Sequence, residues 1–388
     1  MTAVARAVPR ALTGPLGAGR LTIDLGAIDA NARLFAARTT GSLIAVVKAD
    51  GFGHGAPDVA RTALAAGASG LGVTSIGEAL ELRAAGISAS VLSWLNPVDA
   101  DWAAAVGHDV EVAVGSRDHL DAVLAASLGA RVHLHLDTGM ARDGAAPTEW
   151  AALCRAARRA ELQGRLQVVG MMGHLPCAED PDHVSNGRGR HRYAWGLMTA
   201  RATGLRPTQR HLAATSATLL DPLTHHTASR VGAGLVGIDP SGTTTLRPAM
   251  TLRAPLVEIR DVRGGTPVGY GHAWTTPHAT RLGLLPLGYA DGLPRLAADG
   301  GPGAEVQVLG RRVPVVGRIS MDSAVIDLGD LPAVPGTPVT VFGPGEDGEP
   351  TVRDWARAGG VLEHEIVTGL GRRTERVVRP VTALRSIS

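Results

Sequence analysis

Lysine is almost missing from this chain of 388 residues: of its 38 lysine and arginine residues, only Lys48 is a lysine. Arginine keeps its proton under all conditions that proteins meet, so it cannot act as an amine nucleophile or base. A lysine amine can lose its proton in suitable surroundings and then do both. Lys48 ends an apolar run and precedes a glycine-rich one, in the sequence AVVKADGFGHG at residues 45–55. We therefore expect Lys48 to be a catalytic amine at the end of a buried strand.

Cysteine, long apolar runs and charge of one sign are also scarce. Cys154 and Cys177 are too few for a disulfide framework or a zinc site, which fits a reducing compartment. No apolar stretch reaches membrane-spanning length, and residues 1–19 lack the apolar core of a signal peptide. The net charge is +2, with both signs scattered along the chain. These features predict a cytoplasmic protein with no nucleic-acid or membrane partner and no metal site.

Aromatic residues make up only 3% of the chain, although 45% of it is hydrophobic. The core must therefore consist mainly of alanine, valine and leucine. Fifty glycines and 24 prolines indicate many tight turns, and they show no collagen-like period. A chain of this length is expected to form two domains, although one large barrel is also conceivable.

Residues 21–245 show short apolar runs that alternate with helical stretches. About eight such units over this length predict a parallel (β/α)8 barrel. A doubly wound open sheet is the rival, but no G-x-G-x-x-G follows the first strand. Ser75 and Glu78 have the spacing of a capping box and predict a helix start. The expected strands are 43–47, 70–73, 90–93, 110–114, 132–136, 167–171, 210–213 and one near 234–237.

Residues 246–388 have a different pattern, with short β-like runs separated by glycine and proline every eight to twelve residues. This spacing predicts a separate, mostly-β domain with one helix, around 352–358. Residues 1–20 precede both domains as an N-terminal extension. The expected strands are 254–259, 281–286, 305–308, 313–316, 323–326 and 338–342.

The lysine segment resembles the pyridoxal-phosphate attachment segment of bacterial alanine racemases. Further segments resemble the same family, in its order and over nearly the whole chain. This resemblance implies an isomerase with a barrel and a β domain, which binds pyridoxal 5'-phosphate and works as a homodimer with active sites shared between subunits. The matching segments are 74–79, 137–142, 173–174, 229–232, 269–271, 288–292 and 317–322.

Racemisation removes a weakly acidic Cα proton and returns a proton to the opposite face. Pyridoxal phosphate makes this feasible because it delocalises the electrons left behind. The resemblance implies two bases, Lys48 on one face and Tyr270, contributed by the partner subunit, on the other. Tyr270 is one of three tyrosines. A phenol with a pKa near 10 is a poor base unless its neighbours stabilise the phenolate.

The resemblance also implies a set of cofactor contacts. Arg230 matches the arginine that binds the pyridine nitrogen. Because a guanidinium keeps its proton, that nitrogen stays unprotonated and the ring is a weaker electron sink. His174 matches a histidine behind the arginine. The phosphate would lie against Ser216 and the backbone amides of Gly232 and Ala233, a turn suited to an anion.

Substrate contacts follow from the resemblance in the same way. Arg142 and the Met321 amide match groups that hold the substrate carboxylate and the phenolic oxygen of the cofactor. Asp322 is the acidic neighbour of Met321 in the same loop. Tyr289, in the segment 288–292, is a further candidate for substrate binding.

Four positions depart from the family pattern. Phe52 and His364 stand where tyrosines would reach the cofactor phosphate, which removes donors of about 1 kcal/mol each. His135 stands where many members carry a lysine whose carbamate orients the arginine that Arg142 matches. Because side chains alternate along a strand, His135 is expected to face the site. Thr215 replaces an asparagine. These changes put the natural substrate in question more than the fold.

Three functions remain open from the sequence. The leading hypothesis is a racemase for alanine or another small or pathway-specific amino acid. A decarboxylase of the same fold is weaker, because Ser320 stands where such relatives carry a cysteine. A non-catalytic cofactor-binding protein is the third; Lys48 and Tyr270 argue against it, whereas the changed phosphate positions favour it.

Overall fold

The computed structural model describes residues 19–126, 128–299, 302–371 and 373–381. They divide into two compact units. The barrel unit is Leu25–Arg247, and the β unit is Pro248–Pro380 together with the strand at Arg20–Asp24. The expected N-terminal extension, 1–20, lies outside the described residues apart from its last two positions. Within the described part of the chain, no helix is long and apolar enough to cross a membrane.

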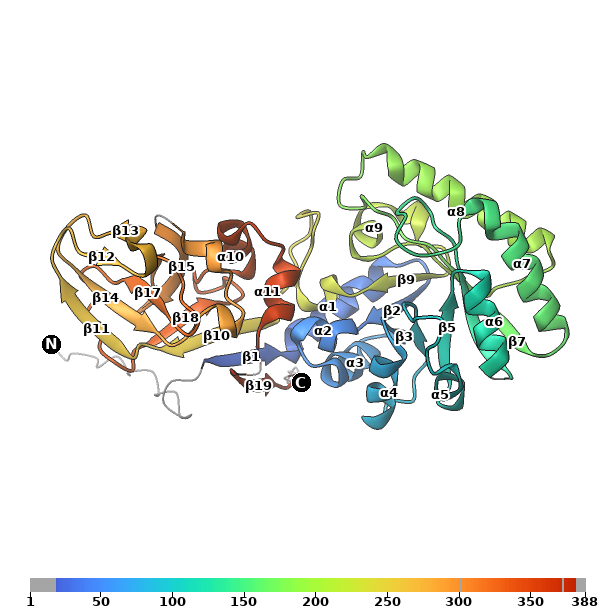
Figure 1. Cartoon of the computed structure of the whole chain (residues 1–388), viewed down its shortest axis with the longest axis horizontal. Helices are drawn as coiled ribbons and strands as arrows, with labels where there is room; N and C mark the ends of the chain where they lie inside the picture. The colour runs from blue at the N-terminus through green and yellow to red at the C-terminus, as the bar shows by residue number, and fades with distance from the viewer. Residues whose placement is uncertain (1–18, 127, 300–301, 372, 382–388) are drawn as a thin grey trace, which may run out of the picture. The chain divides into compact units, whose positions relative to one another are not determined.

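The barrel unit contains eight parallel strands in the order β8-β7-β6-β5-β4-β3-β2-β9 (Figure 1). The two ends of this sheet are linked by backbone hydrogen bonds from Thr227 to Arg210 and from Arg230 to Ala213, each 3.0 Å long, so the barrel nearly closes. This confirms the predicted barrel. The strands are β2 (Ser42–Val46), β3 (Ala68–Val73), β4 (Val91–Ser93), β5 (Val110–Val114), β6 (Ala130–His135), β7 (Leu166–Met172), β8 (Gln209–His211) and β9 (Ala228–Val231).

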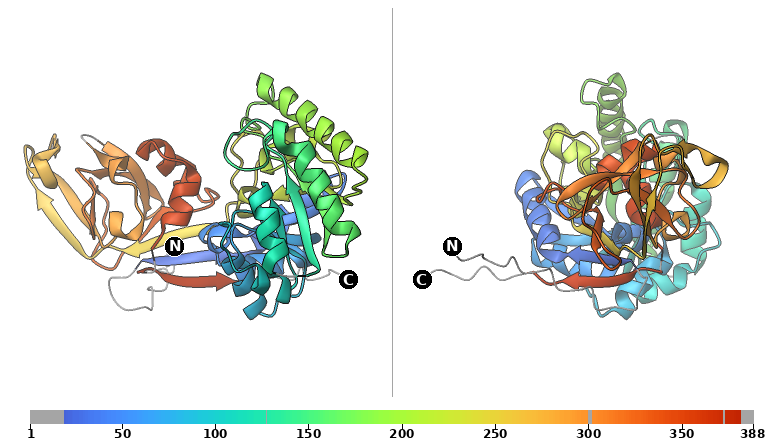
Figure 2. Two further views of the ribbon diagram at one scale, coloured as in Figure 1. Left: turned by 45° about the vertical axis from the view of Figure 1, so that its right-hand side comes forward. Right: turned by 90° about the vertical axis from the view of Figure 1, so that its left-hand side faces the viewer.

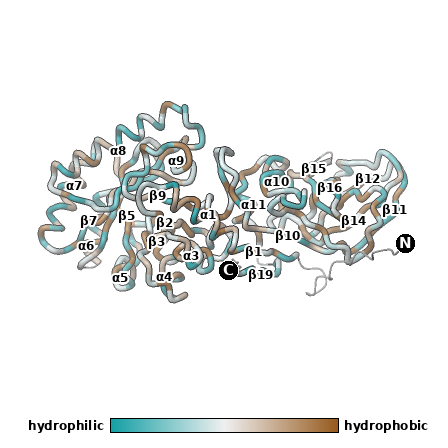
Figure 3. Tube along the Cα trace, turned by 180° about the vertical axis from the view of Figure 1, so that it is seen from behind, coloured by the Kyte–Doolittle hydropathy of each residue, from teal (hydrophilic) through white to brown (hydrophobic). Residues whose placement is uncertain are grey.

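Helices connect consecutive strands and lie outside them (Figures 1 and 2). The capping box at the start of α4 is confirmed, because Ser75 Oγ accepts from the Glu78 amide and the Glu78 carboxylate accepts from the Ser75 amide, both at 3.2 Å. Polar and apolar residues both occur along α7 and α8 (Figure 3), and buried residues recur every three or four positions in each helix, as expected of helices that cover a core. The helices are α1 (Leu25–Arg38), α2 (Lys48–Gly53), α3 (Ala56–Ala65), α4 (Ile76–Ala84), α5 (Trp102–Gly107), α6 (Arg117–Ala126), α7 (Pro147–Leu162), α8 (Val184–Ala202) and α9 (Thr215–Leu220).

The last barrel strand differs from the sequence prediction. The predicted strand near 234–237 is the short 3₁₀ helix η2 (Ala233–Val236), and the eighth strand is β9, at Ala228–Val231. In η2 the Leu235 amide donates to the Gly232 carbonyl at 2.9 Å, and Gly237 ends the turn with a φ of 92°. The error arose because a short buried apolar run has the same composition in a strand and in a helical turn.

The β unit is built around a nine-stranded sheet in the order β11-β14-β17-β16-β15-β18-β10-β1-β19, with a separate pair, β12-β13. This confirms the predicted mostly-β character. Trp355 of α10 packs on the sheet and donates from Nε1 to the Val341 carbonyl at 2.8 Å. The elements are β1 (Arg20–Asp24), β10 (Met250–Pro255), β11 (Glu258–Val262), β12 (Pro267–Val268), β13 (Trp274–Thr275), β14 (Thr280–Leu285), β15 (Pro302–Val308), β16 (Arg311–Val316), β17 (Ala324–Asp327), β18 (Pro338–Phe342), α10 (Val352–Gly359), α11 (Glu363–Gly369) and β19 (Glu375–Arg379).

Three details of this unit differ from the sequence prediction. Residues 21–24 were placed at the start of the barrel, but β1 pairs with β10 and β19 and belongs to the β unit. The single run expected at 254–259 is divided between β10 and β11. A second helix, α11, follows α10. Pairing partners that are distant in sequence decide the position of β1, so local pattern could not reveal it.

Candidate active site

Lys48 follows β2 after one intervening residue, Val47, and begins α2, a turn of unusual backbone conformation. Residues 49–52 have φ values of 52–63°, in the left-handed region. Such a conformation costs roughly 1–2 kcal/mol for each residue that carries a side chain. The turn is held from outside, because the Ala49 amide donates to Glu78 Oε1 at 2.7 Å. Strain of this kind concentrates at functional sites, where the surrounding structure sustains it.

The surroundings of Lys48 favour the neutral amine. Burial and the positive charge of Arg142 lower the pKa of Lys48, and the carboxylate of Glu78 opposes them in part. A lower pKa increases the fraction of amine that is unprotonated near neutral pH. Lys48 therefore has the property that an amine nucleophile or base requires.

Arg230, on β9, is a buried cation held at the end of the barrel. Its side chain is 4% exposed. Nη2 donates to the Gly173 carbonyl at 2.7 Å, and Nη1 donates to the His211 carbonyl at 2.8 Å. Nη1 also lies 2.7 Å from His211 Nδ1. Burial lowers the pKa of Arg230 to about 10, so the guanidinium remains protonated near neutral pH.

His174 lies where several positive charges converge. Its Nδ1 is 3.4 Å from Nη2 of Arg230. Burial, and then the charges of Arg230, Arg142, His135 and Lys48, lower the pKa of His174 to about 3. The imidazole is therefore neutral at physiological pH. The barrel unit thus brings these five predicted site residues into electrostatic contact.

A pocket beside His174 contains His135 and Arg142. His135 Nδ1 lies 3.2 Å from Oδ2 of Asp143, although the two atoms do not have the geometry of a directed hydrogen bond. Burial raises the pKa of Asp143, but its polar neighbours, among them His135 and the Gly144 amide, together lower that pKa overall. The pocket is lined by His135, Leu136, Asp137, Thr138, Met140, Arg142, Asp143 and His174.

Phe52 packs against the turn that is the candidate phosphate site. Ser216 lies in the first turn of α9, Gly232 immediately precedes η2, and Ala233 begins it. A Cβ added at Gly232 would come within 2.6 Å of the Phe52 ring, so that ring covers the turn. Phe52 is 7% exposed and offers no hydrogen-bond donor.

Thr215, the residue before Ser216, has a structural contact. Its Oγ1 accepts from the Gly234 amide at 3.3 Å. This bond ties the start of α9 to η2 and so links the two segments of the candidate phosphate site.

The other predicted site residues lie in the β unit. The side chain of Tyr270, between two glycines with φ values near 70°, is 70% exposed. The loops that carry Tyr289 and Met321 touch, because the Tyr289 amide donates to the Ser320 carbonyl at 3.1 Å. Asp322 Oδ1 accepts from Nη1 of Arg373 at 2.6 Å. His364 lies half-buried on α11.

Comparison with known families decides the relationship of this chain. The model described as "Alanine racemase, N-terminal domain" matches residues 23–240, and the one described as "Alanine racemase, C-terminal domain" matches residues 249–378. The chain belongs to the alanine racemase family.

Individual relatives agree over nearly the full length. The alanine racemase of Thermobifida fusca is 42% identical over 92% of this chain and 96% of its own length. That of Mycolicibacterium smegmatis is 43% identical over 96% of this chain and 97% of its own. The crystal structure of alanine racemase from D-cycloserine producing Streptomyces lavendulae has a TM-score of 0.92 and 41% identity, and covers 95% of this chain and 98% of that one.

Alanine racemases are isomerases that depend on pyridoxal phosphate, and the barrel unit offers suitable groups for that cofactor. The Bartonella henselae alanine racemase, 26% identical with a TM-score of 0.83 and covering 93% of this chain and 99% of its own, is described with covalently bound pyridoxal phosphate. The present chain has one side-chain amine for covalent attachment, Lys48, and its described residues include one buried guanidinium, that of Arg230. Ser216, in the first turn of α9, supplies a hydroxyl next to Thr215, whose Oγ1 accepts from the Gly234 amide of η2. Within the described residues, no cluster of histidine, cysteine and carboxylate groups could hold a metal ion.

Sequence reasoning missed several polar residues around this site. Asp143 lies beside His135, and Glu78 accepts from the amide of Ala49, the residue after Lys48. Glu111, His133 and His211 form a buried network behind Arg230. The only signal was the presence of polar residues inside apolar barrel strands, as in VEVAV at 110–114. That signal does not say which strands bring their polar residues together.

Proposed function

We propose that this protein is a pyridoxal-phosphate-dependent alanine racemase that interconverts L- and D-alanine, with Lys48 and Tyr270 as its two bases. One observation carries the proposal: the single lysine of the chain lies two residues after a barrel strand, and its pKa is lowered by burial and by Arg142. The comparisons favour this activity over the decarboxylase alternative.

We assign three further roles to residues of the barrel unit. When bound, the cofactor delocalises the electrons left on the substrate when the Cα proton leaves. Lys48 takes or returns that proton on one face. Arg230, which keeps its proton, orients the pyridine ring without protonating its nitrogen. His174, neutral at physiological pH, lies beside Arg230 without adding a further positive charge.

Tyr270 serves the opposite face, and we propose that it does so in the partner subunit of a homodimer. Its phenol is 70% exposed in this chain, which leaves it accessible to another subunit. The other residues of the β unit with proposed roles are Met321, Asp322 and Tyr289 near the substrate and His364 near the phosphate. We place this dimer in the cytoplasm.

The pocket that contains Arg142 favours a second candidate, a racemase for another small amino acid. His135 and Asp143 lie 3.2 Å apart in this pocket, where many family members carry a carbamylated lysine. Asp143 supplies a negative charge next to Arg142 in sequence, and the carbamate would supply one as well. A different arrangement of these charges can change which substrate the pocket accepts.

A panel of L- and D-amino acids distinguishes the two candidates. Loss of optical activity is measured for each substrate with the purified protein and with the His135→Lys variant. The leading proposal expects the wild type to racemise alanine fastest and the variant to keep or raise that rate. Loss of activity on some other amino acid in the variant, with alanine turnover unchanged, would favour the second candidate. A wild type that racemises no member of the panel would contradict both.

A further inference from the structure

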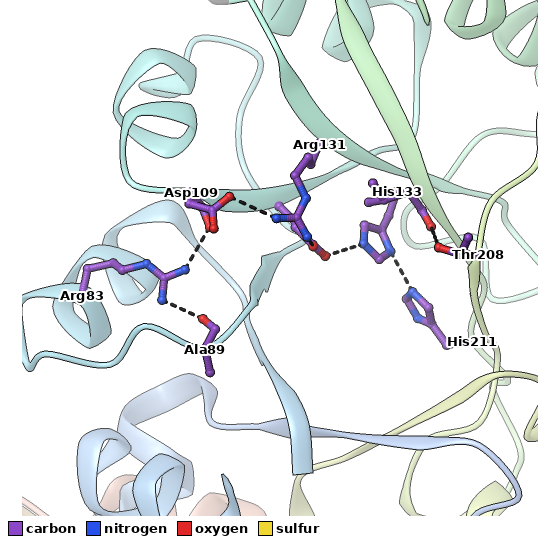
Figure 4. Close-up of polar contacts among 9 residues, drawn as sticks. Arg83, Ala89, Asp109, Arg131, His133, Thr208 and His211 are labelled. Atoms are coloured by element: carbon purple, nitrogen blue, oxygen red, sulfur yellow. Dashed lines mark hydrogen bonds and ion pairs between the residues drawn. The ribbon is translucent and has the colours of Figure 1, made fainter.

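A buried polar network runs through the barrel behind Arg230. His211 Nδ1 is 2.7 Å from Nη1 of Arg230, and His211 Nε2 is 2.8 Å from Nδ1 of His133. His133 Nε2 is in turn 2.8 Å from Oε2 of Glu111. The other oxygen of Glu111 accepts from Arg131. These contacts join four strands, and Figure 4 shows how His211, His133 and Arg131 lie within them.

The donor and acceptor groups of these side chains determine which atom donates in each hydrogen bond of the network. A guanidinium has only donors, so Arg230 donates and His211 Nδ1 must accept. The proton of a neutral His211 is then on Nε2, which donates to His133 Nδ1. His133 carries its proton on Nε2 and donates to the carboxylate of Glu111. Each histidine is therefore held in the tautomer that is protonated on Nε2.

Glu111 is the anion that ends this series of donors. His133 and His211 are 0% exposed, and Glu111 is 1% exposed. Burial raises the pKa of Glu111, but the hydrogen bond from His133 and the charge of Arg131 are among the interactions that lower that pKa overall. Without this carboxylate, His133 could carry its proton on Nδ1. The bond to His211 would then reverse, and His211 would present an N–H to the N–H of Arg230.

The network crosses a strand that lies between its two histidines. His133 is on β6 and His211 on β8, and β7 separates them. The residue of β7 paired with His133 is Gly170. A Cβ at Gly170 would lie 2.0 Å from His133 Nδ1, a distance that no real contact permits. Glycine at this position is what allows one imidazole to reach the other across β7.

We propose that Glu111 is a positioning residue for Arg230. It fixes the tautomers of His133 and His211, so that His211 Nδ1 accepts from the guanidinium and holds it at the cofactor end of the barrel. The contact between Arg230 and the cofactor rests on the proposed function, whereas the tautomers depend only on this chain.

The direct test is nitrogen NMR of the apoenzyme with 15N-labelled histidine, which distinguishes protonated from unprotonated ring nitrogens. The His133→Asn and His211→Asn variants assign the two signals. In the wild type we expect both histidines to be protonated on Nε2 and not on Nδ1. A His211 protonated on Nδ1 in the wild type would overturn the proposal without any further variant.

Two sets of variants test the cause. Glu111→Met removes the acceptor and should mix the tautomers, whereas Glu111→Gln keeps an oxygen acceptor and should restore the wild-type pattern in part. Gly170→Ala displaces the His133 ring without removing a charge and should disturb His211 as well. Gly107→Ala is the matched control, because an added Cβ there meets nothing within 4 Å. Folded Glu111→Met or Gly170→Ala proteins with unchanged His211 signals would overturn the proposal.

Kinetics of the loaded enzyme provide the second measurement. We expect kcat for racemisation in Glu111→Met to fall about tenfold, with KM little changed. Removing a residue that orients a metal ligand typically costs about 10- to 100-fold in activity, and the expected loss is the lower end of that range. The absorbance band of the bound cofactor should shift in the same variant. An inactive wild type whose apoenzyme shows the expected tautomers would contradict the proposed function and leave this inference standing. Normal kcat and normal absorbance in Glu111→Met would contradict the positioning role of Glu111 and leave the proposed function standing.

Discussion

At the residue scale, the proton affinity of His174 is set by its neighbours. Burial and four nearby positive groups lower its pKa from 6.5 to about 3. The unfolded chain therefore binds a proton between these two pH values that the folded chain does not bind. Because the unfolded state then holds more protons, stability decreases as the pH falls through this window.

His174→Gln should remove this source of acid sensitivity. Between pH 7 and pH 4.5, the wild-type apoenzyme should lose about 2–3 kcal/mol more of its free energy of unfolding than the variant, from about 1.36 kcal/mol per pKa unit. Urea unfolding of both proteins at the two pH values measures the difference. Equal losses in the two proteins would show that His174 does not carry the lowered pKa.

The site residues differ in how far the sequence could predict them. The sequence singles out Lys48 because it is the only lysine and ends an apolar run, and the structure places it two residues after β2. Glu111 and His133 were not identifiable. Alternation along a strand predicts which side chains share a face, but the contact between His133 and His211 depends on a missing side chain at Gly170, on the strand between them.

At the element scale, the left-handed turn of α2 controls what faces the candidate phosphate site. The turn carries the ring of Phe52 onto Gly232, where an added Cβ would be 2.6 Å from it. The sequence predicted the missing phenol at this position. It could not predict the turn, because left-handed conformations at 49–52 include three residues with side chains, which local propensity disfavours.

Phe52→Tyr should therefore tighten cofactor binding. A phenol that reaches the phosphate should add about 1.5–3 kcal/mol, the range for hydrogen bonds to charged groups. The dissociation constant of pyridoxal phosphate, measured by equilibrium dialysis, tests this. Phe52→Leu is the control, because it changes the ring without adding a donor and should not tighten binding. An unchanged dissociation constant for pyridoxal phosphate in Phe52→Tyr would show that residue 52 does not face the phosphate.

At the scale of the whole molecule, the local sequence pattern predicted the two types of unit better than it predicted which residues belong to each. The alternation of strands and helices predicted the barrel, and the spacing of glycine and proline predicted the β unit. The membership of β1 could not be predicted. This strand pairs with β10 and β19, more than 200 residues away in the sequence, and such pairings leave no local signal.

The proposed sharing of active sites between two subunits can be tested by complementation. Lys48→Ala and Tyr270→Phe should each be nearly inactive alone, and the second should still bind the cofactor. In a dimer that mixes them, one of the two sites keeps its own Lys48 and receives Tyr270 from the partner subunit. Random re-association of equal amounts should therefore restore about one quarter of the wild-type activity. A mixture as inactive as its components would contradict sharing of this kind.

The most direct test of the central claim is to locate the covalent bond to the cofactor. Borohydride reduction of the loaded protein makes that bond permanent, and peptide mapping by mass spectrometry then identifies the labelled residue. Because the chain has a single lysine, all side-chain label should lie on the peptide that contains Lys48. Label confined to the N-terminal amine, or a purified protein that takes up no cofactor, would contradict the account.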